Sequence, residues 1–193
     1  MAKRVLMIAG PNGAGKTTMA LTLIPNLLKV YDFINADEIA KALAPLHPET
    51  VALTASKLML KRLRELLEAE RSFAFETTAS GTNYVKHLKE ARDRGYEINL
   101  MFLWLSGPDQ AVRRVATRVK QGGHHVPEET IRRRYYAGLK NLVQYYLPIV
   151  DQAMIIDNSS LESKKIIARK NNASSLVIYD MKIWEEIEEG AHV

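Results

Sequence analysis

The chain is 193 residues long and 47% hydrophobic, which is enough to bury one hydrophobic core and favours a single domain. It contains no cysteine, which excludes disulfides, thiol catalysis and a cysteine-based metal site and suits a cytoplasmic protein. The net charge is +5, the longest strongly apolar stretch covers only residues 100–105, and Met1–Arg4 lead directly into a strand, so we expect a soluble protein with no signal peptide and no membrane partner.

The first predicted element is a buried strand over the apolar residues Val5–Ala9, and a phosphate-binding loop follows it directly. The loop reads Gly10-Pro11-Asn12-Gly13-Ala14-Gly15-Lys16-Thr17, is followed by Thr18, and fits the pattern G-x-x-x-x-G-K-[ST]. In such a loop the glycines let backbone N–H groups approach phosphate oxygens, the lysine attracts the β- and γ-phosphates, and the final hydroxyl can ligate Mg²⁺. A helix that begins at Lys16 adds the positive end of its dipole. We therefore predict that residues 10–18 bind ATP and that Thr17 is a Mg²⁺ ligand.

Strands and helices alternate along the rest of the chain, which indicates an α/β fold with a mostly parallel sheet covered by helices. After a helix that ends at Pro25, strands are expected over residues 31–35, 73–76, 98–105 and 153–156. Helices are expected over residues 37–45, 48–70, 82–94 and 127–146, and a further helix, capped by Asp109, before Gly122. Residues 165–168 and 176–179 are expected to form a hairpin, followed by a last helix from Met181.

The order of these elements predicts one domain over residues 1–193, a three-layer sandwich of the P-loop NTPase kinase type. Within it we expect a helical lid over about residues 110–134 and a C-terminal hairpin and helix over about residues 164–189.

Polar residues follow three of the predicted strands, where ligands collect in doubly wound sheets. Asp37 comes just after the second strand and can cap the next helix or, facing the phosphate loop, accept the proton of an attacking hydroxyl as a general base. Glu76 ends the third strand and can orient a substrate hydroxyl, hold a Mg²⁺-bound water or accept hydrogen bonds from Thr77 and Thr78. The segment Asp157–Ser159 follows the fifth strand and is expected to form a turn or a loop beside the adenine.

Basic residues are concentrated between the fourth and fifth predicted strands. They are Arg113, Arg114, Arg118, Lys120, Arg132, Arg133 and Arg134. Such a cluster can hold a triphosphate or a nucleic-acid backbone, or can lie on a solvated helix face. Phosphoryl transfer develops charge on phosphate oxygens, and Lys16 and Mg²⁺ normally need arginines from a mobile segment to stabilise it, which favours a lid. Because Arg134 borders the apolar face of its helix, we expect it to be held more firmly than Arg132 or Arg133.

Four motifs occur in order along the chain. G-P-N-G-A-G-K-T-T begins at Gly10, F-I-N-A-D-E-I-A at Phe33, F-A-F-E-T-T at Phe73 and G-G-H-H-V-P-E-E-T-I-R-R-R-Y at Gly122. Together they resemble the zeta-toxin family of P-loop kinases over about residues 4–160. The resemblance implies phosphorylation of the amino-sugar 3′-hydroxyl of UDP-N-acetylglucosamine with ATP and Mg²⁺. It also implies a sheet in which strand one lies between strands three and four.

The resemblance also assigns roles to particular residues. It makes Asp37 the general base, matches phosphate-clamping arginines best with Arg118 and Arg134, and maps a substrate-contacting glutamate to Glu76. Lys16 completes the expected catalytic set. The family contains stand-alone enzymes as well as toxins, so the resemblance allows an antitoxin partner without implying one.

These features favour a small-molecule kinase that transfers the γ-phosphate of ATP to a hydroxyl. Glu76, Thr77 and Thr78 offer hydrogen-bonding groups suited to a sugar, so UDP-N-acetylglucosamine is the first acceptor to consider. Two other classes stay open. The basic lid also fits a polynucleotide 5′-kinase, although we do not favour a nucleic-acid partner, and the phosphate loop alone fits a nucleotide-binding regulatory module without transfer activity.

Overall fold

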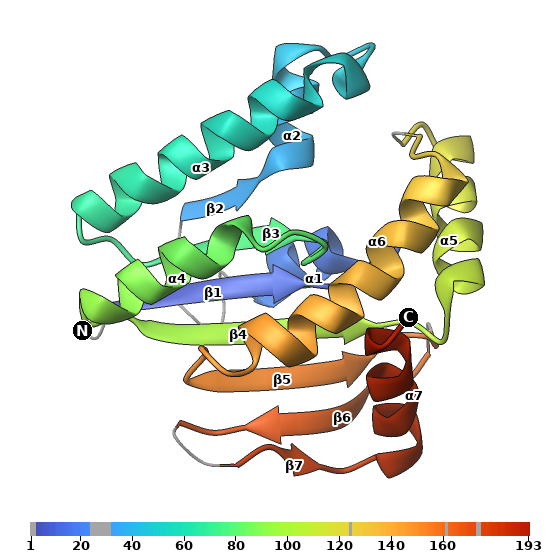
Figure 1. The fold of residues 1–193 in the computed structure, drawn as a ribbon. Coiled ribbons are helices and arrows are strands. Elements are labelled where there is room, and N and C mark those ends of the chain that lie inside the picture. The colour runs from blue at the N-terminus through green and yellow to red at the C-terminus, as the bar shows by residue number, and fades with distance from the viewer. Residues whose placement is uncertain (1–2, 24–31, 124, 161, 173–174) are drawn as a thin grey trace.

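The computed structural model describes residues 3–23, 32–123, 125–160, 162–172 and 175–193, and a seven-stranded sheet forms its centre (Figure 1). The strands are β1 (Arg4–Ala9), β2 (Asp32–Asn35), β3 (Phe73–Thr77), β4 (Glu97–Trp104), β5 (Gln152–Asp157), β6 (Lys165–Lys170) and β7 (Val177–Ile178). Their order is β2-β3-β1-β4-β5-β6-β7, in which the first five strands are parallel and β6 and β7 are antiparallel. Strand β1 therefore lies between β3 and β4, as the resemblance implied.

Helices lie on both faces of the sheet and form the three layers that the sequence predicted (Figure 1). The helices are α1 (Lys16–Leu23), α2 (Ala36–Leu43), α3 (Ala52–Glu68), α4 (Asn83–Asp93), α5 (Pro108–Lys120), α6 (Glu128–Asn141) and α7 (Met181–Ala191). Helices α3, α4 and α6 cover one face, where Met7 and Phe75 belong to the main core. Helix α1 covers the other face, against a smaller cluster that contains Leu6 and Ile8. Within the described residues, no helix is long and apolar enough to span a bilayer.

The bounds of most predicted elements lie within two residues of the observed ones, and the differences in type or in capping concern helices. Helix α5 begins at Pro108 and is preceded by Gly107, which makes no side-chain cap. The prediction that Asp109 caps this helix is therefore wrong, because proline, which has no N–H to satisfy, occupies the first helical position. Asp109 lies in the first turn instead, where it forms an ion pair with Arg132 at 2.6 Å.

Two of the predicted helices are observed in two parts. The helix predicted over residues 48–70 begins with a 3₁₀ turn, Pro48–Val51, before α3. The helix predicted over residues 127–146 is α6 followed by a π-helical turn, Leu142–Tyr146. The predicted hairpin is β6 and β7. The predicted helix end at Pro25 and strand start at Tyr31 lie outside the described residues.

The carboxyl ends of the five parallel strands meet at one edge of the sheet, and the loops at that edge build the site. The phosphate loop leaves β1 at Gly10, whose φ of +140° is one that residues with a side chain rarely adopt. A Cβ at Gly10 would lie 2.3 Å from the carbonyl oxygen of Leu103 on β4. Glycine is therefore required here by both the backbone angle and the close approach of the neighbouring strand.

Candidate active site

The phosphate loop between β1 and α1 curls around the amino group of Lys16. Lys16 is buried, and its Nζ donates a hydrogen bond to the carbonyl oxygen of Pro11 at 3.0 Å. The backbone N–H of Ala14 donates to the same oxygen at 3.2 Å and closes the turn. Burial lowers the pKa of Lys16, and the nearby carboxylates of Glu76 and Asp37 oppose that shift. The loop thus holds the buried ammonium group of Lys16 near the carboxylates of Glu76 and Asp37.

The segment Asp157–Ser159, which begins at the last residue of β5, contacts the phosphate loop. The buried Asn158 donates a hydrogen bond from its Nδ2 to the carbonyl oxygen of Ala14 at 2.6 Å. The backbone N–H of Ser159 donates to Asp157 Oδ1 at 2.8 Å, which forms the turn that we predicted. Arg114 donates to the Ser159 carbonyl oxygen at 2.7 Å, so this member of the basic cluster is bound to the turn. Sequence reasoning missed the contact of Asn158 with the loop, although the polar triplet at a strand end was the signal for it.

Glu76, at the end of β3, lies directly against the phosphate loop. Its Oε2 accepts hydrogen bonds from Thr17 Oγ1 at 2.7 Å and from Asn35 Nδ2 at 2.8 Å, and its Oε1 lies 3.8 Å from Lys16 Nζ. Burial raises the pKa of Glu76, while the charge of Lys16 and the bond from Thr17 oppose the shift. One of the three roles predicted for Glu76 was to accept hydrogen bonds from Thr77 and Thr78. The observed donors to its carboxylate are Thr17 and Asn35.

Thr17 and Glu76 together offer the kind of oxygen ligand that Mg²⁺ prefers. Their hydroxyl and carboxylate oxygens are 2.7 Å apart, beside the start of α1. Across the described parts of the chain, no group of three or more His, Cys, Asp or Glu side chains is gathered as a metal site. Magnesium in phosphate-transfer sites normally takes one or two protein ligands and completes its shell with water and phosphate oxygens. This pair therefore fits the ion that the sequence predicted.

Asp37 lies in the first turn of α2, where its side chain is exposed and lines the pocket next to the phosphate loop. The cap of α2 is Asn35, whose Oδ1 accepts a hydrogen bond from the backbone N–H of Asp37 at 2.8 Å. The capping role considered for Asp37 is therefore wrong, because the neighbouring amide already fills it. The carboxylate of Asp37 stays available to a ligand.

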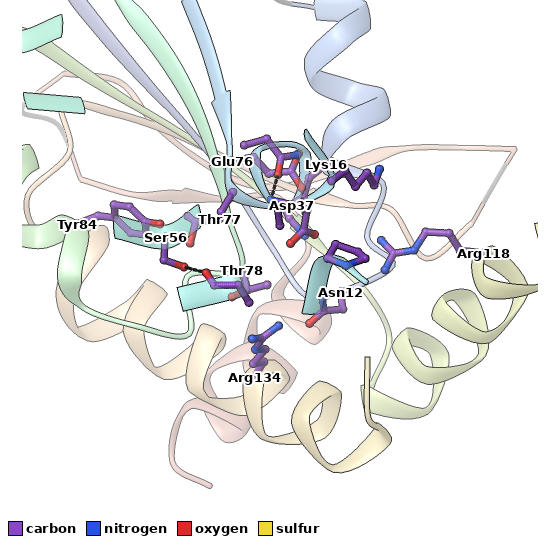
Figure 2. Close-up of a pocket in the computed structure, with 16 residues that line it drawn as sticks. Asn12, Lys16, Asp37, Ser56, Glu76, Thr77, Thr78, Tyr84, Arg118 and Arg134 are labelled. Carbon is purple, nitrogen blue, oxygen red and sulfur yellow. Dashed lines mark hydrogen bonds and ion pairs between the residues drawn. The ribbon is translucent and has the colours of Figure 1, made fainter. Parts of the chain in front are cut away.

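Two arginines line the same pocket, Arg118 from α5 and Arg134 from α6 (Figure 2). Burial lowers the pKa of Arg134, and the charge of Asp37 opposes the shift, so this guanidinium stays a cation held near a carboxylate. Arg132, by contrast, forms surface ion pairs with Asp109 and Glu128 at 2.6 and 2.8 Å. The structure thus brings Arg118 and Arg134 toward Lys16 and leaves Arg132 on the surface.

The other side of the pocket is formed by small and polar residues. Thr77 ends β3 and Thr78 follows it, while Ala36, Ala40 and Lys41 belong to α2, Ala52 and Ser56 to α3, and Tyr84 to α4. In Figure 2, Thr77, Ser56 and Tyr84 gather on one side of Asp37, and Arg118 lies on the other. The pocket has a volume of about 180 Å³ and opens to solvent. Sequence reasoning found Thr77 and Thr78 but missed the residues of the three helices, because they belong to no motif and are brought together only by the fold.

The mostly parallel sheet and the phosphate loop that follows β1 together define a kinase-like P-loop NTPase fold. Residues 5–138 match the family model AAA_33, described as an AAA domain, and the chain belongs to this family. A relative from Haemophilus influenzae, named only as an uncharacterized protein, is 26% identical over 135 residues, which are 70% of this chain and 94% of the relative.

Two solved structures show the same fold at low sequence identity. The structure of the PezAT chromosomal toxin–antitoxin system of Streptococcus pneumoniae matches with a TM-score of 0.66 and 14% identity, over 99% of this chain and 86% of its own. The structure of AvrRxo1-ORF1:-ORF2 with ATP matches with a TM-score of 0.76 and 16% identity, over 96% of this chain and 63% of its own. This chain thus spans less than two thirds of the second structure, and both matches concern the fold.

Proposed function

We propose that the protein is a kinase that transfers the γ-phosphate of ATP to a hydroxyl of a small metabolite, with Mg²⁺ as cofactor. One observation carries the proposal: a single pocket gathers Lys16, Asp37, Arg118 and Arg134 beside a phosphate loop. The cations suit a triphosphate and the carboxylate suits a hydroxyl that must lose its proton. The side of the pocket formed by α2, α3 and the loop after β3 leaves room for an acceptor.

The proposed reaction is a direct transfer. The acceptor oxygen attacks the γ-phosphorus while its proton passes to the carboxylate of Asp37. The bond from the γ-phosphorus to the bridging oxygen breaks, and ADP leaves with that electron pair. Lys16, Arg118 and Arg134 stabilise the negative charge on the phosphate oxygens as the bond breaks. When bound beside Thr17 and Glu76, Mg²⁺ would neutralise charge on the β- and γ-phosphates.

The first acceptor that we propose is UDP-N-acetylglucosamine. The hydroxyls of Thr77 and Thr78 and the carboxylate of Glu76 suit the hydroxyl and amide groups of a sugar, and Lys41 at the pocket wall suits the acceptor's own phosphates. An antitoxin-like partner protein belongs to the same proposal, supported by the toxin–antitoxin origin of the Streptococcus pneumoniae structure. So does a cytoplasmic location, which the absence of cysteine supports.

Phosphorus NMR tests the proposal. The protein is incubated with ATP, Mg²⁺ and UDP-N-acetylglucosamine, and a new sugar-phosphate resonance is expected that Lys16→Ala does not produce. If the resonance is absent, γ-labelled ATP is incubated with a metabolite extract and the labelled product is identified by mass. Efficient labelling of oligonucleotide 5′ ends would instead favour a polynucleotide kinase, and ATP that stays intact with every acceptor would indicate a binding module.

A further inference from the structure

The loop between β3 and α4 has an unusual backbone that brings Thr78 into the pocket. Its central residue, Ala79, is completely buried and has a φ of +57°, a left-handed conformation that is uncommon for a residue with a side chain. Two local bonds shape the loop: the N–H of Ala79 donates to Thr77 Oγ1 at 3.1 Å, and the hydroxyls of Thr78 and Ser80 are 2.8 Å apart. Such a conformation persists only where the surroundings hold it.

One helical segment provides that support. The buried Asn141, the last residue of α6, donates from Nδ2 to the carbonyl oxygen of Ala79 at 2.8 Å. The hydroxyl of Tyr146, a fully buried residue in the π-helical turn, donates to the carbonyl oxygen of Gly81. Helix α6 also packs closely against the loop itself, since a Cβ at Gly138 would lie 2.9 Å from the carbonyl oxygen of Thr78.

The π-helical turn is the reason why both side chains reach the same loop. In a continuous α-helix, residues five apart are rotated by about 140° around the axis, so Asn141 and Tyr146 would face different neighbours. Here the backbone N–H of Leu147 bonds to the carbonyl oxygen of Leu142, which closes a wider turn of the i→i+5 type. The extra residue in the turn brings the hydroxyl of Tyr146 round to the side on which Asn141 lies.

The same helix carries Arg134, which lies one turn before Gly138 and lines the pocket. We infer that Asn141 and Tyr146 are positioning residues, which hold the Thr77–Ser80 segment at a fixed distance from Arg134. This inference rests on the proposed function. In it, the end of α6 rigidly links Arg134, which stabilises the transferred phosphate, to the Thr77–Ser80 segment, which contacts the acceptor. Loss of the link moves the acceptor and leaves the phosphate loop, which is held by β1 and Asn158, in place.

Tyr146→Phe tests the inference, because it keeps the buried ring and removes only the hydroxyl. Tyr135→Phe is a matched control: Tyr135 lies on α6, the helix directly before the π-helical turn, is also buried, and donates at 2.6 Å to the carbonyl oxygen of Leu105, which is not part of the Thr77–Ser80 segment. Hydrogen exchange followed by mass spectrometry, on the full chain without added ligand, should show about fivefold faster exchange over residues 78–84 in Tyr146→Phe alone. Equal exchange over that segment in both variants and the wild type overturns the inference.

Kinetics then test the consequence for the reaction, with UDP-N-acetylglucosamine or the acceptor identified from the extract. Tyr146→Phe should raise the KM for the acceptor or lower kcat about fivefold, with the KM for ATP unchanged, whereas Tyr135→Phe should leave all three near the wild type. Faster loop exchange with unchanged acceptor kinetics, or equal losses for ATP and acceptor, overturns the positioning role. A wild type that transfers phosphate to no acceptor rejects the proposed function, and the exchange data still decide whether the hydroxyl of Tyr146 holds the loop.

Discussion

At the scale of single residues, Asn35 caps helix α2, and the nearby Asp37 lines the pocket without capping the helix. Asn35 caps α2 with its Oδ1 and donates from its Nδ2 to Glu76, so both ends of its amide are engaged. Asp37, two positions later, is left exposed at the pocket. A carboxylate that also capped the helix would have to break that bond before it could accept a substrate proton. This arrangement therefore favours Asp37 as the general base.

Replacing Asp37 by Asn should separate binding from chemistry. The amide keeps the shape of the side chain and removes its basicity, so we expect kcat to fall by about 10²-fold or more while the affinity for ATP, measured by calorimetry, barely changes. Asp93→Asn is a matched control, because Asp93 is also exposed but lies at the end of α4 and does not line the pocket. A wild-type turnover in Asp37→Asn would remove this residue from the mechanism.

The arginines of α5 and α6 should differ according to what each contacts. Arg118 and Arg134 line the pocket, so Ala at either position should lower kcat by about 10³-fold and change the KM for ATP much less. Arg132→Ala breaks two surface ion pairs and should leave both constants near the wild type. If KM for ATP rises alone in the pocket variants, the two residues are affinity contacts without a role in the transition state.

At the scale of elements, α6 depends on a part of the chain beyond the family match. That match ends at residue 138, whereas α7 packs on α6 from residues 181–191. The contact is close: a Cβ at Gly190 would lie 2.6 Å from Leu139 Cδ1. The buried side chains of Trp184 and Ile187 join the same core. Helix α7 therefore supports the helix that carries Arg134.

The junction of β1 and β4 offers a test with a matched pair of glycines. Gly10 and Gly107 have similar φ angles of +140° and +146°, but only Gly10 is crowded, since nothing lies within 4 Å of a Cβ built at Gly107. Alanine at Gly107 should lower the free energy of unfolding by about 1–3 kcal/mol for the backbone conformation alone. Alanine at Gly10 should cost about 1–3 kcal/mol more, because β4 must move. Urea denaturation measures both, and equal losses would contradict the steric argument.

At the scale of the whole molecule, the sequence predicted the fold better than it predicted the site. The alternation of elements and the phosphate-loop motif were enough to predict the layers, the position of Lys16 at the start of α1 and that of Glu76 near the end of β3. The pocket wall from α2, α3 and α4 could not be predicted, because Ala40, Ser56 and Tyr84 are ordinary helix residues until the fold brings them together. The π-helical turn could not be predicted either, because the helical periodicity of residues 127–146 does not distinguish one i→i+5 turn from a continuous α-helix.

The free energy of unfolding should depend on pH through a histidine of α4, His87. His87 has a buried Nδ1 with no hydrogen-bond partner in the described structure, and burial lowers its pKa, with a further contribution from Arg64. The folded state thus binds a proton less readily than the unfolded state, so stability should decrease as the pH falls below about 6.5, the ordinary value. Thermal melts of His87→Gln should show a smaller loss of Tm on acidification than the wild type. His192→Gln, at the exposed end of α7, is the control, and identical pH dependence in wild type and His87→Gln would exclude His87.

Strand β2 lies at the edge of the sheet. The part of the pocket that follows β2 should therefore be less stable locally than the phosphate loop that follows β1. The phosphate loop follows β1, a central strand. Asn35, by contrast, ends a four-residue strand, and Asp37 follows it; among the described residues, this strand pairs only with β3. Ion pairs from Arg62 and Arg71 to Asp32 fasten the start of that strand, and exposed pairs of this kind contribute little. Short marginal strands open in sub-global fluctuations long before a core strand does. Mild denaturant should therefore stop catalysis while the protein still binds nucleotide.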